Sequence, residues 1–169
     1  GSPTMWPKLV NELTHFAYER NIFITIETEG SHFLETDHPI SLLSISPKFS
    51  NSIPSLGITK PLGGIVDQKF IDQHNKSRLN NQAILKSIEY HSDYHIKPVI
   101  DKDLKIWPEI KQWLEDMNIP KSKVWLMPAG DNISSLLESY GPVMDLANQQ
   151  GYNFTGRAHI IAFDTRREV

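Results

Sequence analysis

Residues 22–30, Ile-Phe-Ile-Thr-Ile-Glu-Thr-Glu-Gly, decide the fold class of this chain. The apolar, β-branched first half predicts a buried strand, and the polar second half predicts a turn at the carboxyl end of that strand. Upstream, apolar residues recur at helical spacing from Pro7, which predicts a helix that closes near Asn21. A helix followed directly by a buried strand is the repeating pair of α/β proteins.

The same alternation continues to the end of the chain. Further strands are predicted at 42–45, 95–100, 124–127 and 159–163, and further helices at 67–70, 79–90, 104–117 and 131–150, the last broken or kinked near Gly141-Pro142. Residues 49–65, rich in Ser, Pro, Gly and Asn, are expected to form a long loop over one face, which is a candidate for a lid. Strands that alternate with helices favour a mostly parallel sheet with right-handed crossovers. Five strands cannot close an eight-stranded barrel, so we expect an open sheet or a partial (β/α) barrel in a single domain over 1–169.

Composition excludes several classes of protein. The chain has 169 residues, a net charge of −3 and 39% hydrophobic residues, which suits a single core and gives no basic patch for nucleic acid. No apolar stretch approaches the roughly eighteen residues of a membrane span, and no signal peptide is visible. We therefore expect a cytoplasmic protein that binds neither nucleic acid nor membrane. Cysteine is absent, so this chain cannot hold a metal cluster through thiolates.

Three unusual segments follow predicted strands, where ligands of parallel α/β proteins bind. They are residues 27–30, 46–48 and 127–131. Glu27 and Glu29 could accept hydrogen bonds from a ligand, and Ser46 offers a hydroxyl group. Lys48 offers a cation for a carboxylate, and Gly130 could allow a ligand close to the backbone. Proline and glycine also end strands where no ligand is present, so each segment alone is equally compatible with an ordinary turn.

The histidines do not predict a metal site. His91 and His95 are four residues apart, but a helix–strand boundary separates them and no third ligand is evident. His32 and His38 flank a polar loop and are expected at the surface. His159 opens the last predicted strand, where it could equally be a buried, hydrogen-bonded histidine or a ligand contact.

Taken together in chain order, these segments resemble one enzyme family. Gly1-Ser2-Pro3, the run 27–31 and Ser46-Pro47-Lys48 correspond to the Gly-Gly-Glu-Pro, Glu-Thr-Asn-Gly-Thr and Ser-Pro-Lys motifs of radical S-adenosylmethionine (SAM) enzymes of the 7-carboxy-7-deazaguanine synthase type. The strand HIKPVI resembles the family's lysine-containing strand, VWLMPAGD its Gln-Pro strand end, and GYNFTGRAHIIAF its closing Arg-x-His segment. The resemblance covers nearly the whole chain.

The resemblance implies a partial (β/α) barrel of the radical SAM type whose N-terminal strands are missing here. In the family, a four-iron four-sulfur (4Fe-4S) cluster reduces SAM to a radical that acts on 6-carboxy-5,6,7,8-tetrahydropterin. A Mg²⁺-assisted ring contraction with loss of ammonia then gives 7-carboxy-7-deazaguanine, on the route to queuosine and other 7-deazapurines. The SAM-binding positions implied for this chain are Gly1, Glu27, Ser46, Pro47, Lys48, Met127, Pro128, Ala129 and Gly130. The implied pterin-binding positions are Arg157, His159 and Val169.

Two positions depart from the family pattern, because its acidic residue is Ser2 here and its asparagine is Glu29. The Cys-x-x-x-Cys-x-x-Cys motif that would hold the cluster is also absent, so we expect the isolated chain to be an inactive C-terminal part of a carbon–nitrogen lyase that needs its N-terminal half as a partner. A homodimer is left open. The alternatives are another radical SAM enzyme such as a glycyl-radical activase, and a non-catalytic module that binds a nucleotide, a pterin or a partner protein.

Overall fold

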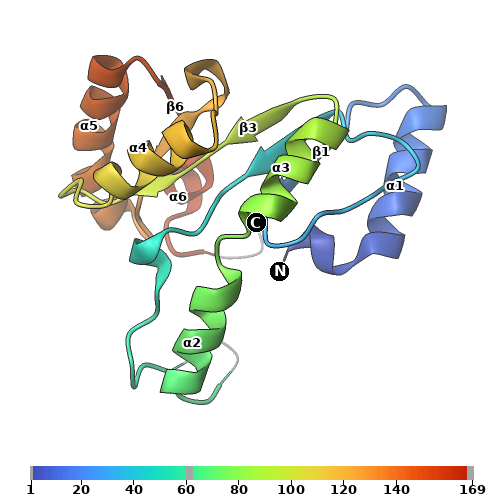
Figure 1. The fold of residues 1–169 in the computed structure, drawn as a ribbon. Coiled ribbons are helices and arrows are strands. Elements are labelled where there is room, and N and C mark those ends of the chain that lie inside the picture. The colour runs from blue at the N-terminus through green and yellow to red at the C-terminus, as the bar shows by residue number, and fades with distance from the viewer. Residues whose placement is uncertain (1, 60–62, 167–169) are drawn as a thin grey trace. The chain divides into compact units, whose positions relative to one another are not determined.

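The computed structural model describes residues 2–59 and 63–166. The chain divides into two compact units, Gly1–Asp93 and Tyr94–Val169, and each is described by itself. Figure 1 shows the helices and strands along the chain. Every strand pairing described within the units is parallel, and the described strands do not close into a barrel. The prediction of an α/β fold with parallel sheets is therefore confirmed.

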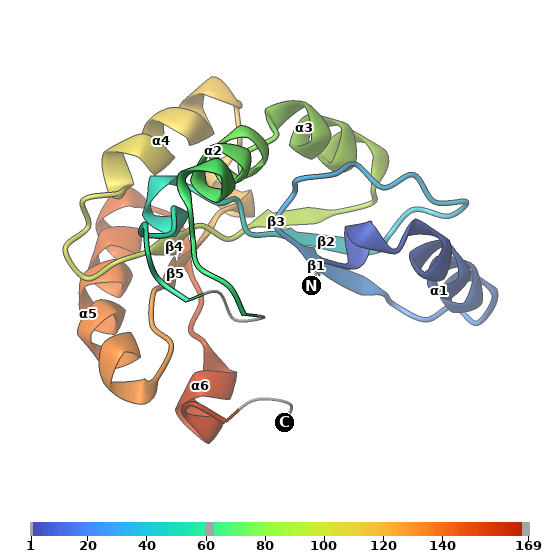
Figure 2. The ribbon, with the colours of Figure 1, turned by 90° about the horizontal axis from the view of Figure 1, so that it is seen from below.

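The first unit is built on two short parallel strands. Helix α1 (Pro7–Glu19) leads into β1 (Thr25–Thr28), which pairs in parallel with β2 (Leu42–Ile45). Helices α2 (Gln68–Ser77) and α3 (Asn81–Tyr90) follow the long loop. Figure 2 shows α1 and α3 beside the β1–β2 pair. The core of this unit consists of buried aliphatic side chains, among them Val10, Ile26, Ile40, Leu43, Ile45 and Ile84.

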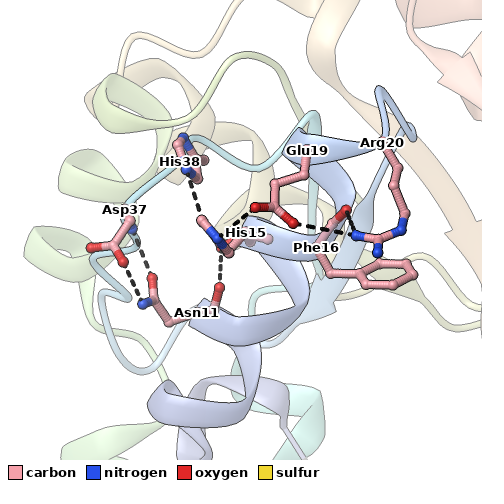
Figure 3. Close-up of polar contacts among 8 residues, drawn as sticks. Asn11, His15, Phe16, Glu19, Arg20, Asp37 and His38 are labelled. Carbon is pink, nitrogen blue, oxygen red and sulfur yellow. Dashed lines mark hydrogen bonds and ion pairs between the residues drawn. The ribbon is translucent and has the colours of Figure 1, made fainter.

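Polar contacts fasten α1 to the loop before β2 (Figure 3). The Nδ2 of Asn11 donates to a carboxylate oxygen of Asp37 at 2.8 Å, and the backbone N–H of Asp37 donates to Asn11 Oδ1 at 2.7 Å. The ring nitrogens of His15 and His38 lie 3.3 Å apart, and Tyr18 stacks on His38 with 3.8 Å between the ring centres. These contacts connect α1 to the loop around Asp37. The sequence predicted a surface position for His38, not a role in binding a metal.

The second unit contains β3 (Tyr94–Ile96), β4 (Val99–Ile100), α4 (Trp107–Asp116), β5 (Trp125–Pro128), α5 (Ile133–Gln150), β6 (Asn153–Phe154) and α6 (Ala158–Phe163). Strand β5 lies between β4 and β6 in a parallel sheet. Helices α4 and α5 connect successive strands and lie on the same face of them (Figure 2). Buried Ile110, Leu114, Leu126, Leu136 and Val143 fill the space between the helices and the strands.

Helix α5 shows how local signals and packing combine. Asn132 begins it with a capping box, in which its side chain accepts from the N–H of Ser135 while the Ser135 hydroxyl accepts from the N–H of Asn132. Gly151 ends it in the left-handed conformation, with φ at 71°. Of the break or kink expected near Gly141-Pro142, the break does not occur, because α5 is a single helix that includes Pro142. Burial of the apolar face on both sides of the proline outweighs the missing backbone hydrogen bond.

Three predicted strands differ from the structure. The run 22–26 is a strand only from Thr25, the strand continues to Thr28, and Ile22 and Phe23 are exposed. The segment 95–100 forms two strands, β3 and β4, that are interrupted at Lys97-Pro98, where proline cannot donate to a strand ladder. The segment 159–163 is not a strand but lies within helix α6. Its five apolar and aromatic residues are too few to separate the two structures by periodicity. The last strand is β6 instead, directly after Gly151.

Candidate functional site

The carboxyl ends of β1 and β2 lie next to each other. Thr28 is paired with Ile45, and the backbone N–H of Ser46 donates to the carbonyl of Thr28 at 2.8 Å. The residues that follow these strands, Glu29 and Ser46, therefore belong to the same edge of the parallel pair. This confirms that the strand ends of the first unit meet at a common edge, as parallel pairing requires.

Glu29 is held in its ionised form at this edge. It is half-buried, and burial alone would raise the pKa of its carboxyl group. The hydroxyl groups of Ser31 and Ser2, the backbone N–H of Glu29 and the Lys48 cation favour the charged carboxylate more than burial disfavours it, which leaves the pKa of Glu29 below its ordinary value. The Ser31 hydroxyl donates directly to Glu29 Oε1. Glu27 lies within β1 and is exposed.

The Ser46-Pro47-Lys48 turn is fixed in place by the structure around it. Pro47 is buried, while Ser46 and Lys48 are half-buried. The Nζ of Lys48 lies 3.4 Å from Ser46 Oγ, and Arg78 donates to the Lys48 carbonyl at 2.8 Å. A carboxylate and an ammonium group are thus placed on neighbouring strand ends, together with several hydroxyl groups. Such a combination can bind a zwitterion.

The second unit carries its own strand-end site. A cavity of about 460 Å³ opens beyond the carboxyl ends of β4 and β5. Its lining comprises Asp101, Lys102, Asp103, Ala129, Gly130, Asp131, Ser135, Glu138 and Ser139. Two of these, Ala129 and Gly130, are predicted site residues. Lys102 and Glu138 form an ion pair at 2.6 Å, and the remaining lining groups are carboxylates, hydroxyls and backbone atoms.

Sequence reasoning missed the polar lining that comes from the β4 end and from α5. A signal existed for Asp101, Lys102 and Asp103, since three charged residues directly follow the strand residue Ile100. No comparable signal marks Glu138 or Ser139, because their contribution depends on how α5 packs against β5.

The packing of α5 against β5 requires a glycine at position 130. A Cβ atom at this position would lie 2.5 Å from Leu136 Cα and 2.6 Å from Leu136 N, in the backbone of α5. The missing side chain therefore lets α5 approach β5, and whether it also admits a ligand stays a prediction. The Gly130 carbonyl accepts a hydrogen bond from the Arg157 guanidinium. The structure thus brings together two predicted residues, Gly130 and Arg157, that were assigned to different ligands.

The remaining predicted residues are placed as follows. Met127 is half-buried and its N–H donates to the Pro98 carbonyl at 3.1 Å, while Pro128 is buried. His159 is exposed on helix α6, which corrects the expectation that it opens a strand. Gly1 and Val169 lie outside the described residues. Whether the groups of the two units serve one ligand stays a prediction.

A second cavity, of about 550 Å³, lies at the opposite end of the second unit. Leu114, Glu115, Asn118, Ile119, Pro120, Lys121 and Tyr152 line it, before β5 begins. The ammonium group of Lys121 donates a hydrogen bond to the Gln150 carbonyl at 2.6 Å. Because this cavity is at the amino end of the strand, it lies away from the edge where ligands of parallel sheets gather.

Among the described residues, neither a cluster of three or more metal ligands nor a membrane-spanning helix is found. No group of three or more His, Cys, Asp or Glu side chains within residues 2–59 and 63–166 is arranged to hold a metal ion. In the same part of the chain, no helix combines the length and the apolar character needed to cross a membrane.

Comparison with known proteins identifies relatives. The chain is 31% identical over 151 residues to a 7-carboxy-7-deazaguanine synthase of Halobacterium salinarum, with 86% of this chain covered. It is 27% identical over 144 residues to a 7-carboxy-7-deazaguanine synthase of Rhodopirellula baltica, with 85% of this chain covered. These alignments include 56% and 52% of the two relatives, so the chain spans about half their length. No protein-family model matches the chain, and no solved structure matches it significantly. The chain is thus a relative of the 7-carboxy-7-deazaguanine synthases, matching them over about half their length.

Proposed function

We propose that this chain is the C-terminal part of a 7-carboxy-7-deazaguanine synthase, a radical SAM lyase that converts 6-carboxy-5,6,7,8-tetrahydropterin to 7-carboxy-7-deazaguanine. The observation that carries the proposal is the similarity to two curated synthases over 85% and 86% of the chain. The parallel strands with polar carboxyl ends support it, because that is where α/β proteins bind nucleoside-like ligands. On this proposal the strands of both units belong to a partial radical SAM barrel.

SAM fits the chemistry of the residues present. Its α-amino acid end is a zwitterion, and the edge of the first unit offers an ionised carboxylate at Glu29 and an ammonium at Lys48. Separately, the cavity of the second unit carries carboxylates and backbone atoms around Ala129 and Gly130, which suit the hydroxyl and amine groups of a nucleoside. Together with a reduced 4Fe-4S cluster, bound SAM would supply the hydrogen-abstracting chemistry of the reaction.

Arg157 is the described residue best suited to the pterin carboxylate. One guanidinium nitrogen donates to the Gly130 carbonyl, which orients the side chain at the β5 strand end. The other nitrogen atoms retain donors that match a carboxylate in a bidentate geometry. His159 and Val169 are proposed as further pterin contacts on the resemblance alone.

The cluster has to be held by residues that this sequence does not contain. There is no cysteine among the 169 residues, and thiolates are the ligands of such clusters. We therefore propose that a further polypeptide segment with the cysteine motif, and with the Mg²⁺ site, completes the enzyme. The isolated chain would then be inactive.

Anaerobic reconstitution tests this function. The protein that contains both this chain and the cysteine-bearing segment is loaded with iron and sulfide, reduced, and given SAM and 6-carboxytetrahydropterin. We expect 7-carboxy-7-deazaguanine and 5′-deoxyadenosine by mass spectrometry, and neither product from the isolated chain. If SAM is cleaved without any deazaguanine, the substrate assignment is wrong; if SAM is neither bound nor cleaved, the radical SAM assignment is wrong as well.

A further inference from the structure

Two histidines from separate segments meet on the surface of the first unit (Figure 3). His15 lies on α1, and His38 lies 23 residues further along the chain, in the loop before β2. The Nδ1 of His15 and the Nε2 of His38 are 3.3 Å apart, while the ring centres are 5.4 Å apart. These two nitrogens are therefore the atoms through which the rings face each other. His15 is exposed and His38 is half-buried, so an ion from solution can reach the pair.

The separation of the two nitrogens matches a tetrahedral metal ion. Zn²⁺ binds histidine nitrogens at about 2.0–2.1 Å, so two such ligands at the tetrahedral angle are about 3.3–3.4 Å apart. Neighbouring ligands of a square-planar ion with the same bond length would be only about 2.9 Å apart. A small rotation of each ring exchanges the hydrogen bond between them for two metal–nitrogen bonds. The geometry therefore favours Zn²⁺ over ions that prefer a square plane.

The His15 ring is already oriented for binding a metal. Its other nitrogen, Nε2, lies 3.2 Å from Oε1 of Glu19, one helical turn further along α1. A carboxylate only accepts hydrogen bonds, so Nε2 of the neutral ring carries the proton and Nδ1 keeps its lone pair. Metal-binding histidines in proteins commonly donate their second N–H to a carboxylate in this way. Glu19 is therefore a positioning residue for His15.

His38 is held beside α1 by contacts of its own. Tyr18 stacks on its ring, with 3.8 Å between the ring centres and 4° between the planes. The Thr36 hydroxyl donates to the His38 carbonyl at 2.8 Å, and the paired hydrogen bonds of Asn11 and Asp37 tie the loop to the helix. None of these contacts requires an ion. The two ligand atoms are thus brought together before an ion binds, which lowers the entropic cost of binding.

We propose that His15 and His38 form a binding site for Zn²⁺ that fastens α1 to the loop before β2. His15 ligates through Nδ1 and His38 through Nε2, and the proton of the His38 ring then resides on Nδ1. Water completes the tetrahedron, because residues 2–59 and 63–166 contain no group of three or more His, Cys, Asp or Glu side chains that could hold a metal ion. The two histidines precede β1 and β2 in the chain, whereas the edge assigned to SAM follows these strands. The inference is therefore independent of the proposed function.

Isothermal titration calorimetry of the untagged chain with ZnCl₂ tests the proposal. His15→Gln and His38→Gln should each weaken zinc binding at least about tenfold, since even the outer contacts of a metal site are worth about 10–100-fold in affinity. Glu19→Ala should cost about tenfold, and Glu19→Gln should recover part of that loss because its amide oxygen still accepts from Nε2. The matched control is His32→Gln, which removes an exposed imidazole between β1 and β2 and should leave the zinc affinity unchanged.

NMR of the unmodified chain supplies a second measurement that does not depend on the folding of any variant. The ring signals of His15 and His38 should shift on addition of ZnCl₂, and those of His32 should not. Circular dichroism checks that each variant is folded, and Zn²⁺ should raise the Tm of the unmodified chain but not that of His38→Gln. No zinc binding, zinc affinity unchanged in both His15→Gln and His38→Gln, or ring signals of both residues unmoved at saturating zinc would each overturn the proposal. All of these results would leave the proposed function standing.

Discussion

Replacing Gly130 by alanine should destabilise the second unit, because the structure has no room for a methyl group there. The added Cβ would lie 2.5 Å from Leu136 Cα, whereas carbon atoms in contact are separated by about 3.5–4.0 Å. The neighbouring atoms belong to the helix backbone and cannot rotate away, so α5 has to shift by about 1 Å relative to β5. Overpacking of this kind costs about 1–3 kcal/mol, and a clash with backbone belongs at the upper end of that range. For a chain of this size, about 3 kcal/mol corresponds to a fall in Tm of roughly 6–12 °C.

Gly141→Ala is the matched control, since it makes the same change within α5 at a position where nothing lies within 4 Å of the added Cβ. Alanine is favoured over glycine in a helix interior by about 0.5–1 kcal/mol, so this variant should be slightly more stable. Thermal unfolding followed by circular dichroism compares both variants with the unmodified chain. A Tm for Gly130→Ala within about 2 °C of the unmodified value would show that α5 does not approach β5 as described, and would refute the explanation given for this glycine.

Further changes have expected outcomes that can be measured independently. Burial lowers the pKa of His91, opposed by the Leu34 carbonyl, and its Nδ1 accepts the Ile40 N–H at 3.2 Å. The folded chain therefore favours the neutral imidazole of His91. The free energy of unfolding should decline as pH falls below about 6.5, where His91 of the unfolded chain binds a proton. Urea unfolding from about pH 7.5 to 5 should show a flatter decline for His91→Asn, and an unchanged pH dependence would contradict this assignment. Asn132→Ala removes the capping box of α5 and should cost about 1 kcal/mol in the same assay; no loss would mean that the cap is not formed in solution. Lys48→Ala should weaken SAM binding with the Tm preserved, and an unchanged dissociation constant would argue against the Ser46–Lys48 turn as part of the SAM site.

Local signals in the sequence predicted much of the fold. Pro7 begins α1 and Gln150 ends α5, as predicted, because helix ends depend on contacts within a few residues. The short helix predicted at 67–70 is instead the ten-residue helix α2 (Gln68–Ser77), which Asp67 caps. Predictions failed where packing decides. Helix α5 continues through Pro142 because its apolar face is buried on both sides, and no local rule for proline contains that information.

The candidate site was predictable in its location but not in its composition. Parallel strands place the residues after them at one edge, so Glu29, Ser46 and Gly130 were correctly expected beyond strand ends. The cavity wall from α5 and the contact between the hydroxyl groups of Ser2 and Thr28 join residues far apart in the sequence. Spacing along the chain cannot predict such contacts. His159 was misplaced for the related reason that a short apolar run fits a helix and a strand equally well.

An NMR titration of the ¹⁵N-labelled chain with SAM tests the central claim most directly, because it reports on every backbone amide at once. The predicted result is that shift changes concentrate at the carboxyl ends of β1 and β2, in residues 29–31 and 46–48. Amides near the cavity lined by Lys121 and Tyr152, at the amino end of β5, should not move. Saturating SAM without any shift change, or with changes confined to that second cavity, would contradict the assignment of the strand ends as the cofactor site.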